Sequence, residues 1–149
     1  MKKILPILFV FFFSCNLSTD TIDIKEINLY EIQNMHFIDI YINGMKSRLL
    51  VDTGASNSLL DISKAERFGF SYLLIDKDKY VGLGGKTDVF IVYDYKIEPF
   101  YVSFLGTDLS EVTRYFTEND MSIIGILGID FLENNKSKID FEANKIYLN

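Results

Sequence analysis

The sequence predicts an all-β fold, built as a small closed barrel with one or two short helices. Short apolar segments alternate with polar residues, and turn-forming residues separate them, a pattern typical of strands. The 149 residues include 13 Phe and 9 Tyr, with many Ile and Val but only 2 Pro, a composition that strands favour. One segment carries clear helix signals. The many short strands and turns in the rest of the chain indicate a barrel.

Composition limits the chain to one folded domain after any N-terminal processing. Hydrophobic residues make up 48% and charged residues 24%, which is typical of a folded chain and excludes a disordered one. The net charge is −6, and it becomes −8 when Lys2 and Lys3 are removed with a leader. This acidic balance argues against a nucleic-acid partner, whose phosphates would be repelled.

The first 15 residues have the pattern of a secretory signal peptide. Two lysines precede an apolar run from Ile4 to Phe13, which is too short to span a bilayer. Cys15 is the only cysteine, so no disulfide can form within the chain. Its place after the apolar run and Ser14 resembles a bacterial lipobox, although two phenylalanines stand where Leu and a small residue are usual.

The sequence is expected to consist of three parts. Residues 1–15 are expected to be a signal peptide ending in the lipobox-like Cys15, residues 16–21 a polar tether, and residues 22–149 the folded domain. We therefore expect an exported protein of the cell envelope, anchored to the membrane by a lipid on Cys15. The alternative is an ordinary leader that is cleaved nearby and leaves a spare cysteine.

The first strands are predicted by alternation. Residues 21–32 are β-like but irregular, and in residues 38–43 three isoleucines alternate with polar side chains, as in a strand with one buried face. Asn43-Gly44 predicts a type I′ hairpin turn, because both central residues of that turn need positive φ. The returning strand runs from Met45 to Val51 and places Asp52 at its end.

A helix and further strands follow. Ser63 and Glu66 form a capping box, and Gly69 is placed to end the helix. Strands are expected at 72–81 and 89–95, on either side of the segment GLGG, and another at 100–105. Residues 106–121 are polar and predict a loop with a short helix. The chain is expected to end with a buried segment, a short helix after Gly128, and a hairpin pairing SKIDF with KIYL.

Several kinds of site are excluded by spacing or by number. The segment GLGGKT lacks the first glycine of a phosphate loop, since Tyr80 stands there, and a strand-like segment follows instead of a helix. His36 is the only histidine, and no GxSxG motif accompanies it, so a serine-histidine triad is not indicated. One histidine and one cysteine also exclude a zinc site built on these residues.

The segment Asp52-Thr53-Gly54 has a specific context: an apolar strand precedes it, and Ala55-Ser56 and the apolar pair Leu59-Leu60 follow. With these flanks the sequence resembles the retropepsin-like aspartic proteases, which include retroviral proteases and many single-domain bacterial relatives. Three blocks carry the resemblance in the family's order. They are IDIYINGMKSRLLVDTGASNSLLD for the hairpin and active-site loop, VGLGGKT for the flap, and GILGIDFLENNKSKIDFEANKIYL for the closing element.

The resemblance implies an aspartic endopeptidase that acts on polypeptides and needs no metal or organic cofactor. Hydrolysis needs a base that takes a proton from water and an acid that protonates the leaving nitrogen. Two carboxylates about 3 Å apart share one proton and can play both parts. Because the chain contains one DTG and no DSG, the second carboxylate has to be Asp52 of another copy, which predicts a homodimer.

The resemblance also implies roles for the loop residues. The N–H of Gly54 is expected to point at the carboxylates, and Thr53 to form a hydrogen bond across the dimer axis. Ala55 follows the retroviral pattern, whereas pepsins have Ser or Thr there, which implies a less acidic working pH. For Ser56, a supporting hydrogen-bond donor and a simple turn residue are both open.

Other segments acquire roles in the same way. Leu83, Gly84 and Gly85 are expected to form the tip of a flap that closes over an extended peptide, although the tip lacks an aromatic residue. Gly128, or Gly125 in another register, is expected to let a buried strand pass beneath the Asp52 loop. Two other functions stay open, namely an inactive envelope module that binds peptides with the same barrel, and a structural lipoprotein.

Overall fold

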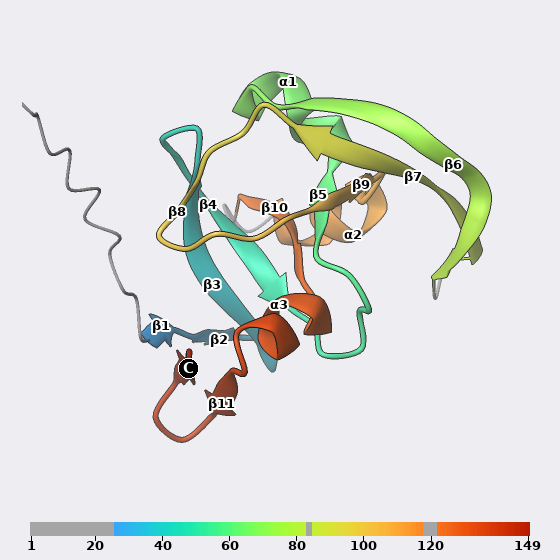
Figure 1. Cartoon of the computed structure of the whole chain (residues 1–149). Coiled ribbons are helices and arrows are strands. Elements are labelled where there is room, and N and C mark those ends of the chain that lie inside the picture. Colours follow the sequence, from blue (N-terminus) through green and yellow to red (C-terminus); the bar gives the residue numbers. More distant parts are fainter. Residues whose placement is uncertain (1–25, 83–84, 118–121) are drawn as a thin grey trace, which may run out of the picture.

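The computed structural model describes residues 26–82, 85–117 and 122–149, which form two β-sheets with short helices around them (Figure 1). The larger sheet has nine strands, in the order β2-β3-β4-β10-β5-β9-β7-β6 with β8 on β3, and the smaller sheet has the order β1-β12-β11. The expected all-β class with short helices is confirmed. The strand order runs from β2 at one edge to β6 at the other, so closure of the barrel stays a prediction. The homodimer also stays a prediction.

The bounds of the elements are as follows. The strands are β1 Glu26–Asn28, β2 Tyr30–Ile32, β3 Met35–Ile42, β4 Met45–Val51, β5 Leu59–Asp61, β6 Ser71–Gly82, β7 Gly85–Tyr93, β8 Ile97–Glu98, β9 Leu105–Thr107, β10 Ile123–Leu127, β11 Lys138–Asp140 and β12 Lys145–Tyr147. The helices are the 3-10 turn η1 Ile62–Lys64, α1 Ala65–Phe68, α2 Ser110–Thr117 and α3 Ile129–Asn134. None of the helices in these described ranges is long and apolar enough to cross a membrane.

The β3–β4 hairpin forms as the sequence predicts. Asn43 has a φ of 48° and Gly44 a φ of 79°, as a type I′ turn requires. The Asn43 amide donates to the carbonyl oxygens of Phe68 and Gly69, both at 2.9 Å. The turn is therefore fixed to the end of α1, and the hairpin holds β4 in position for the residue that follows it.

Charge also fixes the register of this hairpin. Asp39 lies opposite Arg48, and its carboxylate accepts from Arg48 Nε at 2.8 Å and pairs with Lys46 at 2.8 Å. Partial burial raises the pKa of Asp39, but these two hydrogen bonds outweigh it and leave the pKa below the ordinary 3.8. The ionised Asp39 therefore stabilises the folded state fully above pH 3.8. This stabilisation is lost as the pH falls through the lowered pKa of Asp39.

The core lies between the curved larger sheet, α1 and α3. The alternation in β3 buries one face, and Ile38, Ile40 and Ile42 are all 0% exposed. Side chains from distant parts of the chain pack against them, including Leu49, Leu60, Phe68, Phe104, Leu127 and Phe131. Burial of these large apolar groups is the main stabilising contribution to the fold.

The start of the first helix differs from the expected capping box. Asp61, not Ser63, is the cap: its carboxylate accepts from the backbone N–H of Ser63 at 3.1 Å and from the Ser63 hydroxyl at 2.7 Å. Glu66 is exposed. The expected end is confirmed, since Gly69 has a φ of 69°. Asp61 is 0% exposed and also accepts from Leu109 N and Thr113 Oγ1, so one buried carboxylate joins β5 to the start of α2.

The strand expected at 100–105 is wrong except at its last residue, where β9 begins. The alternation is real, because Phe100, Val102 and Phe104 are buried. Backbone groups of Val102 and Phe104, however, form hydrogen bonds with a side chain. The Tyr95 hydroxyl donates to Val102 O at 3.0 Å and accepts from Phe104 N at 3.2 Å, in the place of a neighbouring strand.

Candidate active site

Asp52 follows directly after β4, at the centre of the larger sheet. β4 pairs in parallel with β10, and Val51 lies opposite Leu127. The pairing continues one residue further, because the Asp52 N–H donates to Leu127 O at 3.0 Å. The backbone of Asp52 is therefore held by the sheet, and this half-buried residue starts the loop that leads to β5.

The loop turns tightly at Gly54. The Gly54 N–H donates to Asp52 Oδ1 at 2.8 Å, and the Ala55 N–H donates to Asp52 O at 3.1 Å. The structure thus places the Gly54 N–H on the carboxylate, as the resemblance implied. Thr53, Gly54 and Ser56 are exposed and Ala55 is half-buried, so the loop presents a polar surface outward from the single chain.

Gly128 lies against the backbone of this loop. A Cβ added to Gly128 would lie 2.6 Å from the carbonyl carbon of Asn57 and 2.8 Å from Ala55 O. The next residue, Ile129, donates its N–H to Ala55 O at 2.9 Å. Gly128 therefore occupies the place expected for the glycine beneath the Asp52 loop. Gly125, the other register, packs against the backbone of Leu59, where an added Cβ would lie 2.0 Å from the carbonyl oxygen.

Two residues that support the loop were missed by the sequence reasoning. Ser58 is 0% exposed. Its hydroxyl donates to Asp130 Oδ1 at 2.7 Å and accepts from the Gly128 N–H at 3.0 Å. The same Asp130 oxygen accepts from the Phe131 N–H at 2.8 Å, at the start of α3. Ser58 thus joins the end of the Asp52 loop to the α3 segment, 72 residues away in the chain.

Replacement of Ser58 by alanine is expected to lower the free energy of unfolding by about 1–3 kcal/mol, because it leaves the buried Gly128 N–H without its acceptor. The α3 segment and the Asp52 loop would then be less tightly joined. Urea denaturation followed by circular dichroism measures the loss. Ser56→Ala is the matched control and is expected to change the value by less than about 0.5 kcal/mol, since Ser56 is exposed. Equal effects of the two variants would contradict the supporting role of Ser58.

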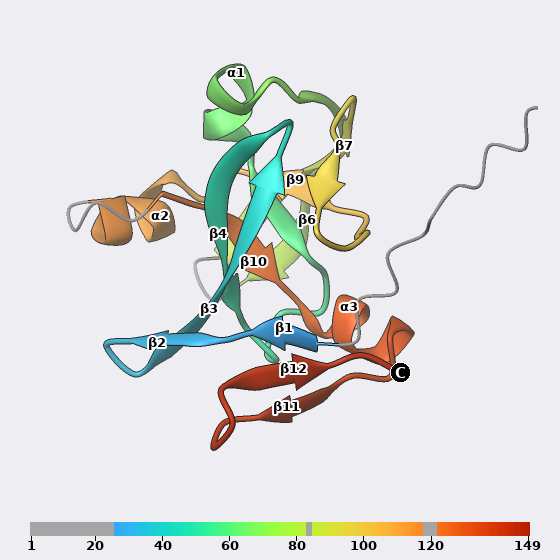
Figure 2. The ribbon, with the colours of Figure 1, turned by 90° about the vertical axis from the view of Figure 1, so that its left-hand side faces the viewer.

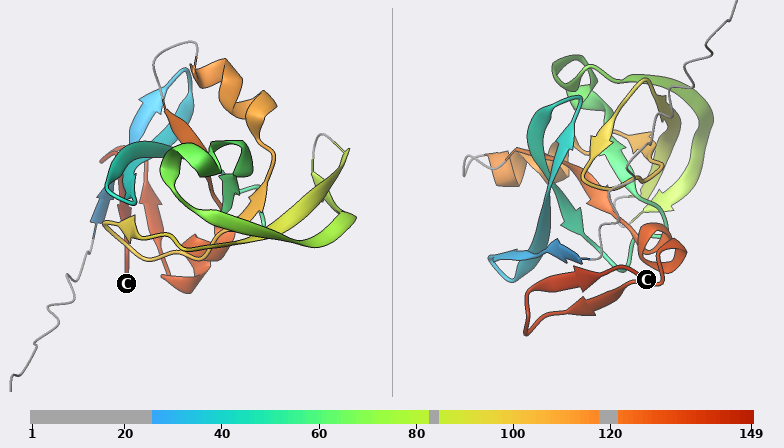
Figure 3. Two further views of the ribbon diagram at one scale, coloured as in Figure 1. Left: turned by 90° about the horizontal axis from the view of Figure 1, so that it is seen from above. Right: turned by 60° about the vertical axis from the view of Figure 1, so that its left-hand side comes forward.

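The expected flap corresponds to the β6–β7 hairpin, which projects from the body of the molecule (Figure 3). Tyr80 pairs with Thr87, and Gly82 pairs with Gly85. Leu83 and Gly84, the predicted tip, lie outside the described residues, and Gly85 is the first residue of β7. Near the hairpin, the Thr87 hydroxyl lies 2.8 Å from the Thr107 hydroxyl of β9, which links β7 to the strand beside β5.

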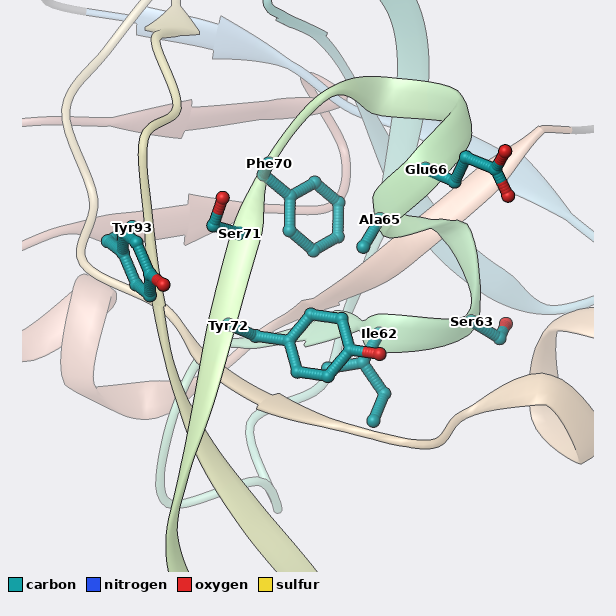
Figure 4. Close-up of a pocket in the computed structure, with 8 residues that line it drawn as sticks. All are labelled: Ile62, Ser63, Ala65, Glu66, Phe70, Ser71, Tyr72 and Tyr93. Carbon is teal, nitrogen blue, oxygen red and sulfur yellow. The ribbon is translucent and has the colours of Figure 1, made fainter.

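A concavity of about 530 Å³ lies beside the start of β6 (Figure 4). Its lining comes from η1, α1, β6 and β7, and consists of Ile62, Ser63, Ala65, Glu66, Phe70, Ser71, Tyr72 and Tyr93. None of these residues belongs to the Asp52 loop. The concavity is therefore separate from the candidate catalytic residue.

The described residues offer no ready metal site: across 26–82, 85–117 and 122–149, no three His, Cys, Asp or Glu side chains are grouped as ligands. Cys15, the expected lipid-bearing residue, lies outside the described residues. The groups at the candidate site are the Asp52 carboxylate and the backbone N–H groups around it.

Comparison with known proteins agrees with this arrangement. The family model of gag-polyprotein putative aspartyl proteases matches residues 38–134, a range that contains the Asp52 loop, the β6–β7 hairpin and α3. No curated protein matches the chain.

Three solved structures share the fold. The EIAV protease, solved in complex with the inhibitor HBY-793, aligns with a TM-score of 0.53 and 20% identity, covering 75% of this chain and 98% of that one. A retropepsin-like aspartic protease from Rickettsia conorii aligns with a TM-score of 0.50 and 20% identity, covering 83% and 89%. The retroviral protease-like domain of Ddi1 from Leishmania major gives 0.50 and 21%, covering 77% and 88%.

Proposed function

Because the chain belongs to the family of gag-polyprotein putative aspartyl proteases, we propose that it is an aspartic endopeptidase whose active site forms between two copies. The observation that carries the proposal is the Asp52 loop itself. Its carboxylate stands at the end of a central strand, held by Leu127 O and by the Gly54 N–H. A single chain supplies one such carboxylate, and the reaction needs two.

In the dimer, the two Asp52 carboxylates share one proton and hold a water between them. The ionised carboxylate takes a proton from this water as its oxygen attacks the peptide carbonyl carbon, while the protonated one stabilises the carbonyl oxygen. The carboxyl group that took the proton from water then gives it to the leaving nitrogen, and the C–N bond breaks, which gives a new carboxyl end and a new amino end and leaves the pair with one shared proton. The backbone hydrogen bond from Gly54 orients the carboxylate before the reaction begins.

The family supports a polypeptide as the substrate class. A polypeptide in extended conformation can lie between the β6–β7 hairpin and the Asp52 loop, with its backbone bonded to the hairpin as an added strand. Its side chains then alternate between pockets on the two sides. This mode of binding favours an endopeptidase that reads several residues around the cleaved bond.

The proposal is tested with the purified full chain and a mixed peptide library, from about pH 3 to pH 8, with mass spectrometry to locate the cleaved bonds. The fraction of dimer is measured at the assay concentration by sedimentation. Cleavage is expected, and the rate per chain should rise with the dimer fraction because each site needs two chains. A chain that is fully dimeric and cleaves no peptide at any pH would favour the peptide-binding module over the enzyme.

We also propose that the enzyme is exported and anchored to the envelope by a lipid on Cys15, on the strength of the leader sequence. Cells grown with radioactive palmitate should label the wild-type chain, and Cys15→Ser should lose the label and leave the membrane fraction. Ser14→Ala is the matched control, because a small residue still precedes Cys15. Equal labelling of the Cys15 variant and the wild type would contradict the anchor.

A further inference from the structure

The β6–β7 hairpin is joined to the rest of the larger sheet by a short ladder. β7 pairs with β9 at two positions, Phe90 opposite Gly106 and Ile91 opposite Leu105, and β9 lies beside β7 in the sheet (Figure 2). In the part of the chain that the structure describes, β6 pairs only with β7. The placement of the hairpin on the body of the molecule therefore depends largely on residues 87–91 of β7, the root of the hairpin.

A side chain continues the connection where this ladder ends. Thr107 is the last residue of β9 and is 4% exposed. Its hydroxyl donates to Asp88 O at 3.0 Å and lies 2.8 Å from the Thr87 hydroxyl. Because the single proton of Thr107 Oγ1 is directed at Asp88 O, Thr87 is the donor in the second hydrogen bond. One buried hydroxyl therefore holds two consecutive residues of the hairpin root.

The two strands also pack closely at the residue before Thr107. A Cβ added to Gly106 would lie 2.8 Å from Ile62 Cγ2 and 2.9 Å from Val92 Cγ2. It would also lie 3.3 Å from the Cβ of Phe90, the residue opposite Gly106. Such close packing leaves no room for a methyl group. The missing side chain at Gly106 thus lets β7 approach β9, so that the Thr107 hydroxyl reaches the hairpin root.

The other side of β9 is fixed to the end of the Asp52 loop. β9 pairs in parallel with β5, with Thr107 opposite Asp61. The Leu105 N–H donates to Ser58 O at 3.1 Å, and the hydroxyl of the same Ser58 joins the loop to α3. Since β9 is three residues long, it is bonded to the loop at its first residue and to the hairpin at its last.

We propose that Thr107 is a positioning residue for peptide hydrolysis, and that its hydroxyl fixes the hairpin root, through β9, relative to the Asp52 loop. The inference rests on the proposed function, in which the backbone of the substrate binds to the hairpin. Without the two hydrogen bonds the end of the ladder opens more often, and the hairpin spends a smaller fraction of time in the position that binds peptide.

This mechanism predicts which kinetic constant changes. The apparent Kd of a peptide rises as the fraction of binding-competent hairpin falls. The chemical step at Asp52 is unchanged once the peptide is bound. Loss of the Thr107 hydroxyl is therefore expected to raise KM and to leave kcat nearly unchanged.

Thr107→Val tests the inference, because it removes both hydrogen bonds and nearly keeps the shape of the side chain. In the full chain, purified in mild detergent, KM for a peptide that the wild type cleaves is expected to rise at least about fivefold, and kcat to change less than about twofold. Thr107→Ser keeps the hydroxyl and should return KM to within about twofold of the wild-type value. Thr87→Val removes one of the two bonds, so its KM should lie between those of the wild type and Thr107→Val.

Tyr95→Phe is the matched control. It also removes one hydroxyl that donates one hydrogen bond, to Val102 O at 3.0 Å, and accepts another, from Phe104 N at 3.2 Å. Both bonds lie in the segment between β8 and β9 and neither involves the hairpin root. A loss of stability with a wild-type KM is expected, which separates a general loosening of the fold from displacement of the hairpin.

Hydrogen–deuterium exchange followed by mass spectrometry tests the same inference without any substrate. In Thr107→Val the backbone amides of residues 87–91 and 105–107 are expected to exchange at least about fivefold faster than in the wild type, because the end of the β7–β9 ladder opens more often. The β3–β4 hairpin is the internal reference and should keep the wild-type exchange rate. Tyr95→Phe should leave residues 87–91 at that rate as well.

The outcomes separate this inference from the proposed function. Unchanged exchange at the hairpin root of Thr107→Val overturns the inference, whether or not the chain cleaves peptides. Faster exchange with a wild-type KM overturns the positioning role and leaves the proposed function standing, as does an equal rise of KM in Tyr95→Phe. Faster exchange in a chain whose wild type cleaves no peptide leaves Thr107 as the residue that holds the hairpin and overturns the proposed function.

Discussion

Replacing Asp52 by asparagine is expected to abolish peptide cleavage while the chain remains folded and dimeric. Asparagine has the same size, and its Oδ1 can still accept the Gly54 N–H that lies 2.8 Å away in the wild type. Its amide cannot take a proton from water at neutral or acidic pH. General base catalysis alone contributes roughly 10²–10⁴-fold, so we expect the rate to fall at least about a hundredfold.

The measurement compares initial rates on one cleaved peptide at equal dimer concentration. Asp94→Asn is the matched control, because Asp94 is exposed and has a φ of 58°, a conformation that asparagine also accepts. The control should keep the wild-type rate. An Asp52→Asn dimer that retains more than about a tenth of the wild-type rate would show that another group acts as the base.

The same variant also tests whether each site needs two chains. When an excess of Asp52→Asn is added to the wild type and the subunits exchange, most wild-type chains pair with a variant chain. Because one carboxylate cannot serve as both base and acid, the activity should fall well below that of the undiluted wild type. Unchanged activity after exchange would indicate that a single chain carries a complete site.

Much of the fold could be predicted because the responsible signals are local. Residues that are close in sequence determine three of these features. They are the positive φ values at Asn43-Gly44, the burial of alternate residues in β3, and the left-handed backbone at Gly69. The turn at the start of the Asp52 loop belongs to the same class, because the hydrogen bonds that shape it join Asp52 to Gly54 and Ala55. Here a short motif specifies both the bend and the direction of the donors.

The rest could not be predicted because the partners are distant in sequence. Nothing near Ser58 indicates that its hydroxyl meets Asp130, and the pair is visible only once β10 lies beside β4 and β5. Asp61 replaces Ser63 as the cap because the buried carboxylate also serves the start of α2. Likewise, Tyr95 supplies the hydrogen bonds that a strand would otherwise give to Val102 and Phe104. Tertiary contacts decide each of these cases.

Replacing Gly128 by alanine is expected to cost about 3 kcal/mol of unfolding free energy, the upper end of the usual range for overpacking, and to reduce activity as well. The added methyl would lie 2.6 Å from the carbonyl carbon of Asn57 and 2.7 Å from its oxygen. These are backbone atoms of the loop that follows Asp52, so they cannot turn away as a flexible side chain would. Relief of the overlap has to move the loop or the β10–α3 connection, and overpacking of this kind costs roughly 1–3 kcal/mol and occasionally more.

Gly44→Ala separates the loss of stability from the loss of function. Gly44 has a φ of 79° with no atom within 4 Å of an added Cβ, so its replacement costs roughly 1–2 kcal/mol for the left-handed backbone alone. Because Gly44 lies at the far end of the β3–β4 hairpin from Asp52, the folded fraction of this variant should keep the wild-type rate. The folded fraction of Gly128→Ala should be at least about tenfold slower, since a displacement near 1 Å is enough to misalign reacting groups. Rates are compared per folded dimer, with the folded fraction taken from urea denaturation at the assay temperature. If Gly128→Ala proved slower only in proportion to its unfolded fraction, Gly128 would support the fold but not the placement of Asp52.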